Sequence, residues 1–197
     1  PASRGACAVP RDAALPTASS LNLAPGMVRP NLVTVRVPAD GVVKFYNAFG
    51  ATDLIVDVVG YYDLTRLNNN SGRFVPVLAA RAYDTRDYGI TLGPDELGLF
   101  EIAGYDFVGV DLGATAVVLN VTAVTPTANG YLAAFPGDLC EIPTTSNVNF
   151  TAGQTIPNAV VVGLSTGLSC DIARGWIGIY NPFGNTHVII DVAGWFM

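Results

Sequence analysis

The pattern of hydrophobic and polar positions contains two short apolar runs, each interrupted by a single aspartate. They are residues 54–58 (LIVDV) and residues 188–192 (VIIDV). Short continuous runs rich in β-branched residues are typical of strands that are buried on both faces. An unpaired carboxylate in such a strand is unfavourable, so the sequence predicts a fixed partner for Asp57 and for Asp191.

The two runs belong to an internal repeat. Residues 16–37 align with residues 143–164 without a gap, and residues 41–62 align with residues 175–196 after seven additional residues in the later copy. Of the 44 paired positions, 19 are identical, which is more than a shared strand composition would produce. We therefore interpret the two segments as copies of one structural unit.

Each copy contains a further apolar segment, at residues 32–37 and at residues 159–164. A Pro-Asn pair precedes each segment and is typical of a turn that leads into a strand. The repeat thus predicts two strands in each copy that are rich in valine, leucine and isoleucine.

The repeat divides the chain into one complete unit and one half-unit. Residues 74–136 have no counterpart upstream, so the complete unit covers residues 74–197 and the half-unit covers residues 1–62. Residues 63–73 are polar, Asn-rich and without periodicity, which predicts a linker. We expect an antiparallel β-sandwich, Ig-like or jelly-roll-like, with about nine strands in the complete unit and about four in the half-unit.

The composition favours the same all-β fold class. Half of the 197 residues are apolar and 13% are charged, with 21 glycines and 13 prolines, as expected for strands joined by tight turns. No run reaches the roughly 18 apolar residues of a spanning helix, so no membrane insertion is expected. The net charge is −6 and the arginines form no basic stripe, which argues against nucleic acid as a partner.

The sequence carries no signature of an enzyme, a cofactor or a metal site. It contains no G-x-S-x-G, no phosphate-binding glycine loop followed by lysine, and no H-E-x-x-H. Cys7, Cys140 and Cys170 form no C-x-x-C, and His187 is the only histidine, which is too little for a zinc site. Disulfide chemistry is favoured for the cysteines, with three buried free thiols as the alternative.

The charged candidates have a structural and a functional interpretation. Asp84 and Arg86 alternate along a predicted strand and share one face; an internal ion pair is favoured over a ligand site. For Asp57 and Asp191, backbone amides or an arginine are favoured over a bound cation, because no calcium-binding D-x-D-x-D-G spacing is present.

Both copies end in an aromatic pair, Tyr61-Tyr62 and Trp195-Phe196. These side chains could stack on sugar rings. Such residues more often close the end of a sandwich.

Five short motifs give the complete unit a resemblance to a known family. They are Asp84-Thr85-Arg86, VVLNVT at 117–122, SNVNF at 146–150, AGQT at 152–155 and DVAGWF at 191–196. They resemble a repeat module that occurs in tandem in secreted and surface proteins of actinobacteria and some other bacteria. Its units carry DTR, VVLNVT, SNLNF, AGQT and a closing DVxGYF. The resemblance implies an extracellular, β-rich module of poorly defined activity, often found in arrays or beside hydrolase domains.

The resemblance also implies a disulfide, because members often carry a cysteine pair placed like Cys140 and Cys170. This bond would close a loop of about 30 residues and stabilise the fold by roughly 3 kcal/mol. It would suit an oxidising, extracellular environment. Cys7 is then left over, which favours a bond to another chain or to a segment outside this sequence. The chain begins at Pro1 without a leader pattern, which we interpret as a processed or partial chain.

These features predict a non-enzymatic protein that is extracellular or on the cell surface. The first hypothesis is a structural module that self-associates into a homo-oligomer, surface assembly or filament, with the half-unit completed by a strand of another chain. The alternative is a carbohydrate-binding module that tethers a secreted protein to cell-wall or other glycan through the terminal aromatic residues.

Overall fold

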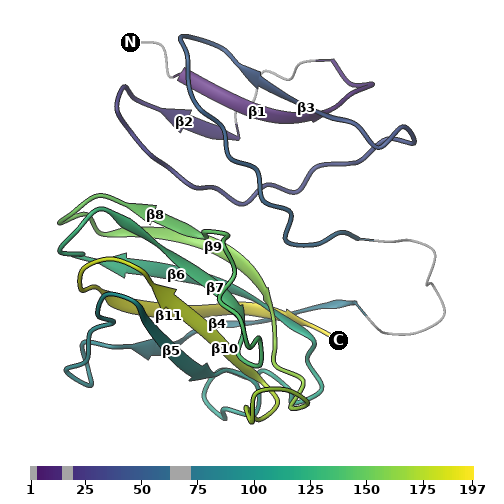
Figure 1. The fold of residues 1–197 in the computed structure, drawn as a ribbon. Coiled ribbons are helices and arrows are strands. Elements are labelled where there is room, and N and C mark those ends of the chain that lie inside the picture. Colours follow the sequence, from purple (N-terminus) through teal and green to yellow (C-terminus); the bar gives the residue numbers. More distant parts are fainter. Residues whose placement is uncertain (1–3, 15–19, 63–71) are drawn as a thin grey trace. The chain divides into compact units, whose positions relative to one another are not determined.

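The protein is all-β. The computed structural model describes residues 4–14, 20–62 and 72–197, and these residues form antiparallel sheets and turns with no helix (Figure 1). The chain divides into two compact units, Pro1–Val56 and Asp57–Met197.

Two four-stranded antiparallel sheets form a sandwich in the second unit. Its strands are β4 (Phe74–Asp84), β5 (Glu96–Glu101), β6 (Ala116–Val124), β7 (Gly130–Pro136), β8 (Val148–Phe150), β9 (Ile156–Gly163), β10 (Trp176–Asn181) and β11 (His187–Phe196). The sheets have the orders β4-β11-β6-β9 and β5-β10-β7-β8. With the eight strands renumbered from one, these orders are 1-8-3-6 and 2-7-4-5, the arrangement of a jelly roll and not of an Ig-like sandwich. The unit has eight strands where about nine were expected.

β11 lies in the interior of its sheet, hydrogen-bonded to β4 on one side and to β6 on the other. Val188, Ile190 and Val192 are at most 1% exposed and belong to the core between the two sheets. The prediction of a buried strand at residues 188–192 is therefore confirmed.

A disulfide joins two loops of the sandwich. Cys140, which follows β7, is bonded to Cys170, which lies between β9 and β10, with 5.8 Å between their Cα atoms. The carboxylate of Asp138 accepts hydrogen bonds from the backbone N–H and the hydroxyl of Thr166, both at 2.7 Å. These bonds lower the pKa of Asp138. The predicted pairing of Cys140 with Cys170 is confirmed, and hydrogen bonds hold the same loops together.

The half-unit contains a three-stranded antiparallel sheet in the order β2-β1-β3. Its strands are β1 (Arg4–Pro10), β2 (Leu21–Leu23) and β3 (Val43–Asn47). Their pairing has the register of β8-β7-β10 in the complete unit. Pro10 faces Val43 as Pro136 faces Ile177, and β2 pairs with β1 in step with β8 and β7. β1, β2 and β3 are therefore the counterparts of β7, β8 and β10.

A side-chain hydrogen bond is repeated along with the strands. The amide of Asn47 donates to the carbonyl oxygen of Gly50 at 3.0 Å, and the amide of Asn181 donates to the carbonyl oxygen of Gly184 at 2.8 Å. The local structure of the repeat is thus the same in both copies wherever both copies form strands.

Two predicted strands of the half-unit are not strands in the structure. Residues 32–37 and 54–58 have no strand geometry, so three strands are described where about four were expected. Their counterparts β9 and β11 are both hydrogen-bonded to β6, and the described part of the half-unit has no counterpart of β6. The apolar pattern alone does not form a strand there, because strand stability depends on pairing and packing partners.

The boundary between the units falls after Val56, within the run 54–58 and not at residue 62. The predicted linker, residues 63–73, lies outside the described residues except for Gly72 and Arg73. The N–H of Gly72 donates to the carbonyl oxygen of Met197 at 2.7 Å, so the approach to β4 lies beside the end of β11.

Candidate functional site

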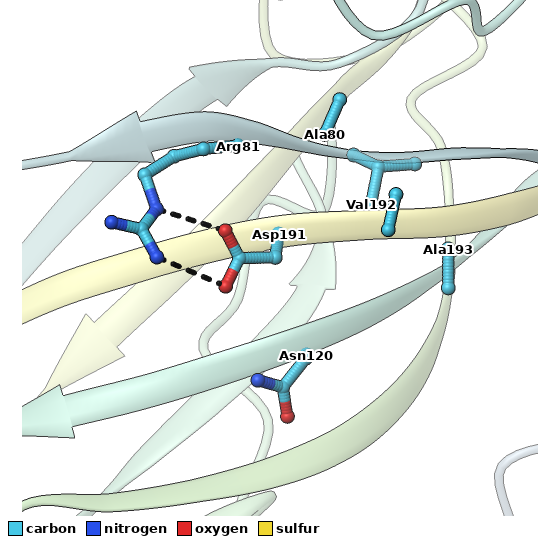
Figure 2. A pocket seen from close by; sticks show the side chains of 7 residues that line it. Ala80, Arg81, Asn120, Asp191, Val192 and Ala193 are labelled. Atoms are coloured by element: carbon cyan, nitrogen blue, oxygen red, sulfur yellow. Dashed lines mark hydrogen bonds and ion pairs between the residues drawn. The ribbon is translucent and has the colours of Figure 1, made fainter.

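An ion pair joins β4 to β11, and Figure 2 shows its two side chains, Arg81 and Asp191, pointing toward each other. Nε of Arg81 donates to Oδ1 of Asp191 at 2.9 Å, and the other end of the guanidinium donates to Oδ2 at 3.5 Å. Arg81 also lies 3.5 Å from the carboxylate of Asp84. The pairing with Asp191 raises the pKa of Arg81. The predicted fixed partner of Asp191 is therefore Arg81, and the carboxylate is partly exposed, not buried.

Asp84 and Arg86 form the predicted ion pair at the end of β4. Arg86 donates to the carboxylate from Nε at 2.8 Å, from a terminal nitrogen at 2.5 Å and from its backbone N–H at 3.1 Å. Asp84 is only 4% exposed. The hydrogen bonds from the Arg86 side chain lower the pKa of Asp84 to about 2, so the carboxyl group is ionised at neutral pH.

Thr85, between these two residues, connects β4 to β11. Its hydroxyl accepts a hydrogen bond from the backbone N–H of Val188 at 2.9 Å, and its own N–H donates to the carbonyl oxygen of Val188 at 3.0 Å. His187, the first residue of β11, lies with Nδ1 2.9 Å from the carbonyl oxygen of Ile90. The Asp84-Thr85-Arg86 motif thus holds the end of β4 against the start of β11, which is a structural role.

A surface hollow lies beside the Arg81–Asp191 pair, and Figure 2 shows its lining. The lining residues are Ala79, Ala80, Arg81, Asn120, Asp191, Val192 and Ala193. The carboxylate there is already neutralised by the guanidinium, and no nucleophile and base are paired in the lining. Across the described ranges, no group of three or more His, Cys, Asp or Glu side chains is placed to hold a metal ion.

The terminal aromatic pair of the complete unit, Trp195-Phe196, is not free to stack on a ligand. Trp195 is half-buried and packs against the hydrophobic core. Phe196 is 8% exposed, with its ring 5.4 Å from that of Phe74. The expectation that these two residues present a glycan platform is corrected, because β4 covers Phe196 and Trp195 packs against the core. Tyr61 and Tyr62 are 86% and 68% exposed.

The outstanding feature of the half-unit is residues 54–62, which we call the unpaired segment. Leu54, Val56 and Val58 are 54%, 52% and 86% exposed, whereas their counterparts in β11 are at most 1% exposed. The described residues give the segment no strand partner. An apolar run that forms an interior strand in one copy is thus solvent-exposed in the other.

The segment equivalent to β9 shows the same difference. Val33 and Val37 are 39% and 58% exposed, while their counterparts Val160 and Leu164 are 2% and 5% exposed. β6 lies between β11 and β9. The lack of a counterpart of β6 among the described residues therefore accounts for the exposure of both segments.

Two predictions for the half-unit find no support among the described residues. Asp57 is exposed, and within the described part of the chain, which includes no counterpart of Arg81, its carboxylate has no hydrogen-bond or ion-pair partner. Cys7 is a free thiol but is 7% exposed; the register places it at the position of Ala133, a fully buried residue of β7. A buried thiol does not support the expected bond to another chain.

Comparison with protein-family models, curated proteins and solved structures finds no match for this chain. Within the described residues, no helix has the length and apolar character needed to cross a membrane. The argument for function therefore depends on the fold and on the difference between the two copies.

Proposed function

We propose that this chain is a non-enzymatic, extracellular structural module that associates with copies of itself or with neighbouring repeats and forms part of a surface assembly or filament. The half-unit is the place of association. The observation that supports this proposal is the exposure of residues 54–62, whose counterpart β11 is an interior strand.

The unpaired segment has both properties that strand addition needs. Its backbone has no strand partner among the described residues, so its N–H and C=O groups can pair with another chain. Its exposed apolar side chains include Ile55 at 84% and Val58 at 86%. Full burial of one such side chain is worth about 1.5–3 kcal/mol, so several of them can offset the free-energy cost of association.

An extracellular location is supported by the disulfide between Cys140 and Cys170. Such bonds persist mainly in oxidising compartments.

The alternative of glycan binding has weaker support. Of the four aromatic residues proposed for it, Trp195 and Phe196 are covered in the complete unit. Tyr61 and Tyr62 lie on the unpaired segment, so the missing strands are sufficient to explain their exposure. We therefore favour assembly.

Light scattering and negative-stain electron microscopy of the full chain over a range of concentrations test this proposal. We expect oligomers or filaments that grow with concentration, since association by an exposed strand follows mass action. A protein that stays monomeric at every concentration would refute it. The control variant is Leu78→Asp, which should assemble like the unmodified chain, because Leu78 is 94% exposed on β4 and lies outside the half-unit.

A further inference from the structure

We propose that the occupant of the half-unit is a continuous segment equivalent to β4, β5 and β6, supplied by another repeat of the same kind, with an arginine placed against Asp57. This inference deepens the proposed function, because it names the partner of the half-unit and the contact that sets its register.

The first step is what the half-unit lacks. β1, β2 and β3 correspond to β7, β8 and β10, and residues 29–36 and 54–62 correspond to β9 and most of β11. In the complete unit, β6 lies between β11 and β9, β4 flanks β11, and β5 flanks β10. The missing strands are therefore β4, β5 and β6, which are consecutive in the sequence. One continuous segment would supply all of them.

The second step is Asp57. Its counterpart Asp191 faces Arg81 of β4 and Asn120 of β6 in the strand registers, and Arg81 binds it through both oxygens. Asp57 has the same place in the repeat but is exposed and unpartnered among the described residues. A segment with an arginine at the position of Arg81 would give Asp57 the missing pair.

The third step is Gly60, which is independent of charge. A Cβ on its counterpart Gly194 would overlap the ring of Phe74 and lie 2.8 Å from the carbonyl oxygen of Val75, so β4 requires glycine there. A Cβ on Gly60 would meet nothing within 4 Å. The half-unit thus has a glycine that its own structure does not need but that a strand like β4 would require.

The fourth step is the count of halves. The described residues contain one first half, β4 to β6, and two second halves, β7 to β11 and the half-unit. A copy that donated its own first half would open its own sandwich. The occupant of the half-unit is therefore a further first half, separate from the β4 to β6 that complete the sandwich.

The test is a chain in which residues 72–129 are copied directly ahead of Arg4. The copied β6 then leads into β1 as β6 leads into β7. Hydrogen exchange of residues 54–62 is compared with that of the unmodified chain. We expect exchange to slow at least about 100-fold, toward that of residues 188–196. Arg81→Glu in the copied segment should reduce this protection by about threefold, because the pair is partly exposed, and Asp57→Arg added to it should restore the protection.

A disulfide trap tests the register without relying on the stability of the extended chain. Because Leu119 faces Val192, Leu119→Cys in the copied segment should form a bond with Val58→Cys. It should form none with Ile55→Cys, whose counterpart faces Thr122.

The outcomes separate the two proposals. Unchanged exchange together with no Val58 bond overturns this inference, even if the unmodified chain assembles. Protection of residues 54–62 in the extended chain upholds it, even if the unmodified chain proves monomeric and the proposed function fails.

Discussion

Arg81 of β4 binds Asp191 of β11 through both carboxylate oxygens, at 2.9 and 3.5 Å. Arg81 is half-exposed and Asp191 is 29% exposed, so solvent screening keeps the contribution of the pair to stability small. Its main effect is on register, because it lies where the pairing of β11 with β4 shifts by one residue. The half-unit has the equivalent aspartate, Asp57, but the described residues include no counterpart of Arg81. This difference identifies a strand equivalent to β4 as the missing partner.

Val58 and Val192 form a matched pair of sites, since they share a position in the repeat but are 86% and 1% exposed. Val192→Asp should destabilise the sandwich by at least about 3 kcal/mol, because it buries a charge between the sheets. Val58→Asp should leave the unfolding free energy within about 0.5 kcal/mol and should reduce self-association. Urea unfolding and light scattering measure the two effects. Assembly that persists unchanged in Val58→Asp would argue against the unpaired segment as the joint.

Much of the fold follows from the sequence, for identifiable reasons. The run at residues 188–192 predicted an interior strand because both of its faces are apolar. The same run at residues 54–58 gave a wrong prediction, because strand formation needs a partner strand and the pattern of one segment does not reveal whether that partner exists. The repeat contained part of this information, since residues 74–129, which include β6, have no counterpart in the half-unit.

The candidate site was predicted only in part. The ion pair of Asp84 with Arg86 is local, two residues apart, and could be read from the motif. The contact of Arg81 with Asp191 could not, because it depends on the register between two strands that are 110 residues apart in the chain. The burial of Phe196 likewise depends on Phe74 across the sheet.

The Asp84 carboxylate predicts an acid-sensitive step in stability. Its pKa is lowered to about 2 in the folded protein by Arg86, compared with about 3.9 in an unfolded chain. Its contribution is therefore complete above about pH 4 and is lost as the pH falls toward 2. Asp84→Asn should lower stability at pH 7 by about 1–2 kcal/mol and should flatten this part of the pH dependence. Denaturant unfolding from pH 7 to pH 2 measures both. An equally steep acid loss in Asp84→Asn would contradict the assignment.

The disulfide closes a loop with a sequence separation of 30 residues. Replacing both Cys140 and Cys170 with serine should lower the unfolding free energy by about 3 kcal/mol on the chain-entropy estimate. The change should be smaller if Asp138 and Thr166 keep the two loops together. Cys7→Ser is the control variant. Because Cys7 forms no disulfide, this substitution should not change how the stability of the protein responds to reductant. If reductant destabilises the double variant as much as the unmodified chain, the loss does not come from this bond.

Gly60 and Gly194 give the last prediction. Gly194→Ala should destabilise the sandwich by about 1–3 kcal/mol, because the new methyl group meets the ring of Phe74 and the carbonyl oxygen of Val75. Gly60→Ala should be neutral in the unmodified chain, where nothing lies within 4 Å of the new atom. It should become destabilising in a chain that carries a second copy of residues 72–129, because the copied Phe74 would then lie over it. Thermal unfolding measures these effects, for Gly194→Ala in the unmodified chain and for Gly60→Ala in both backgrounds. If Gly60→Ala is neutral in both backgrounds, the added segment does not cover the half-unit as β4 covers β11.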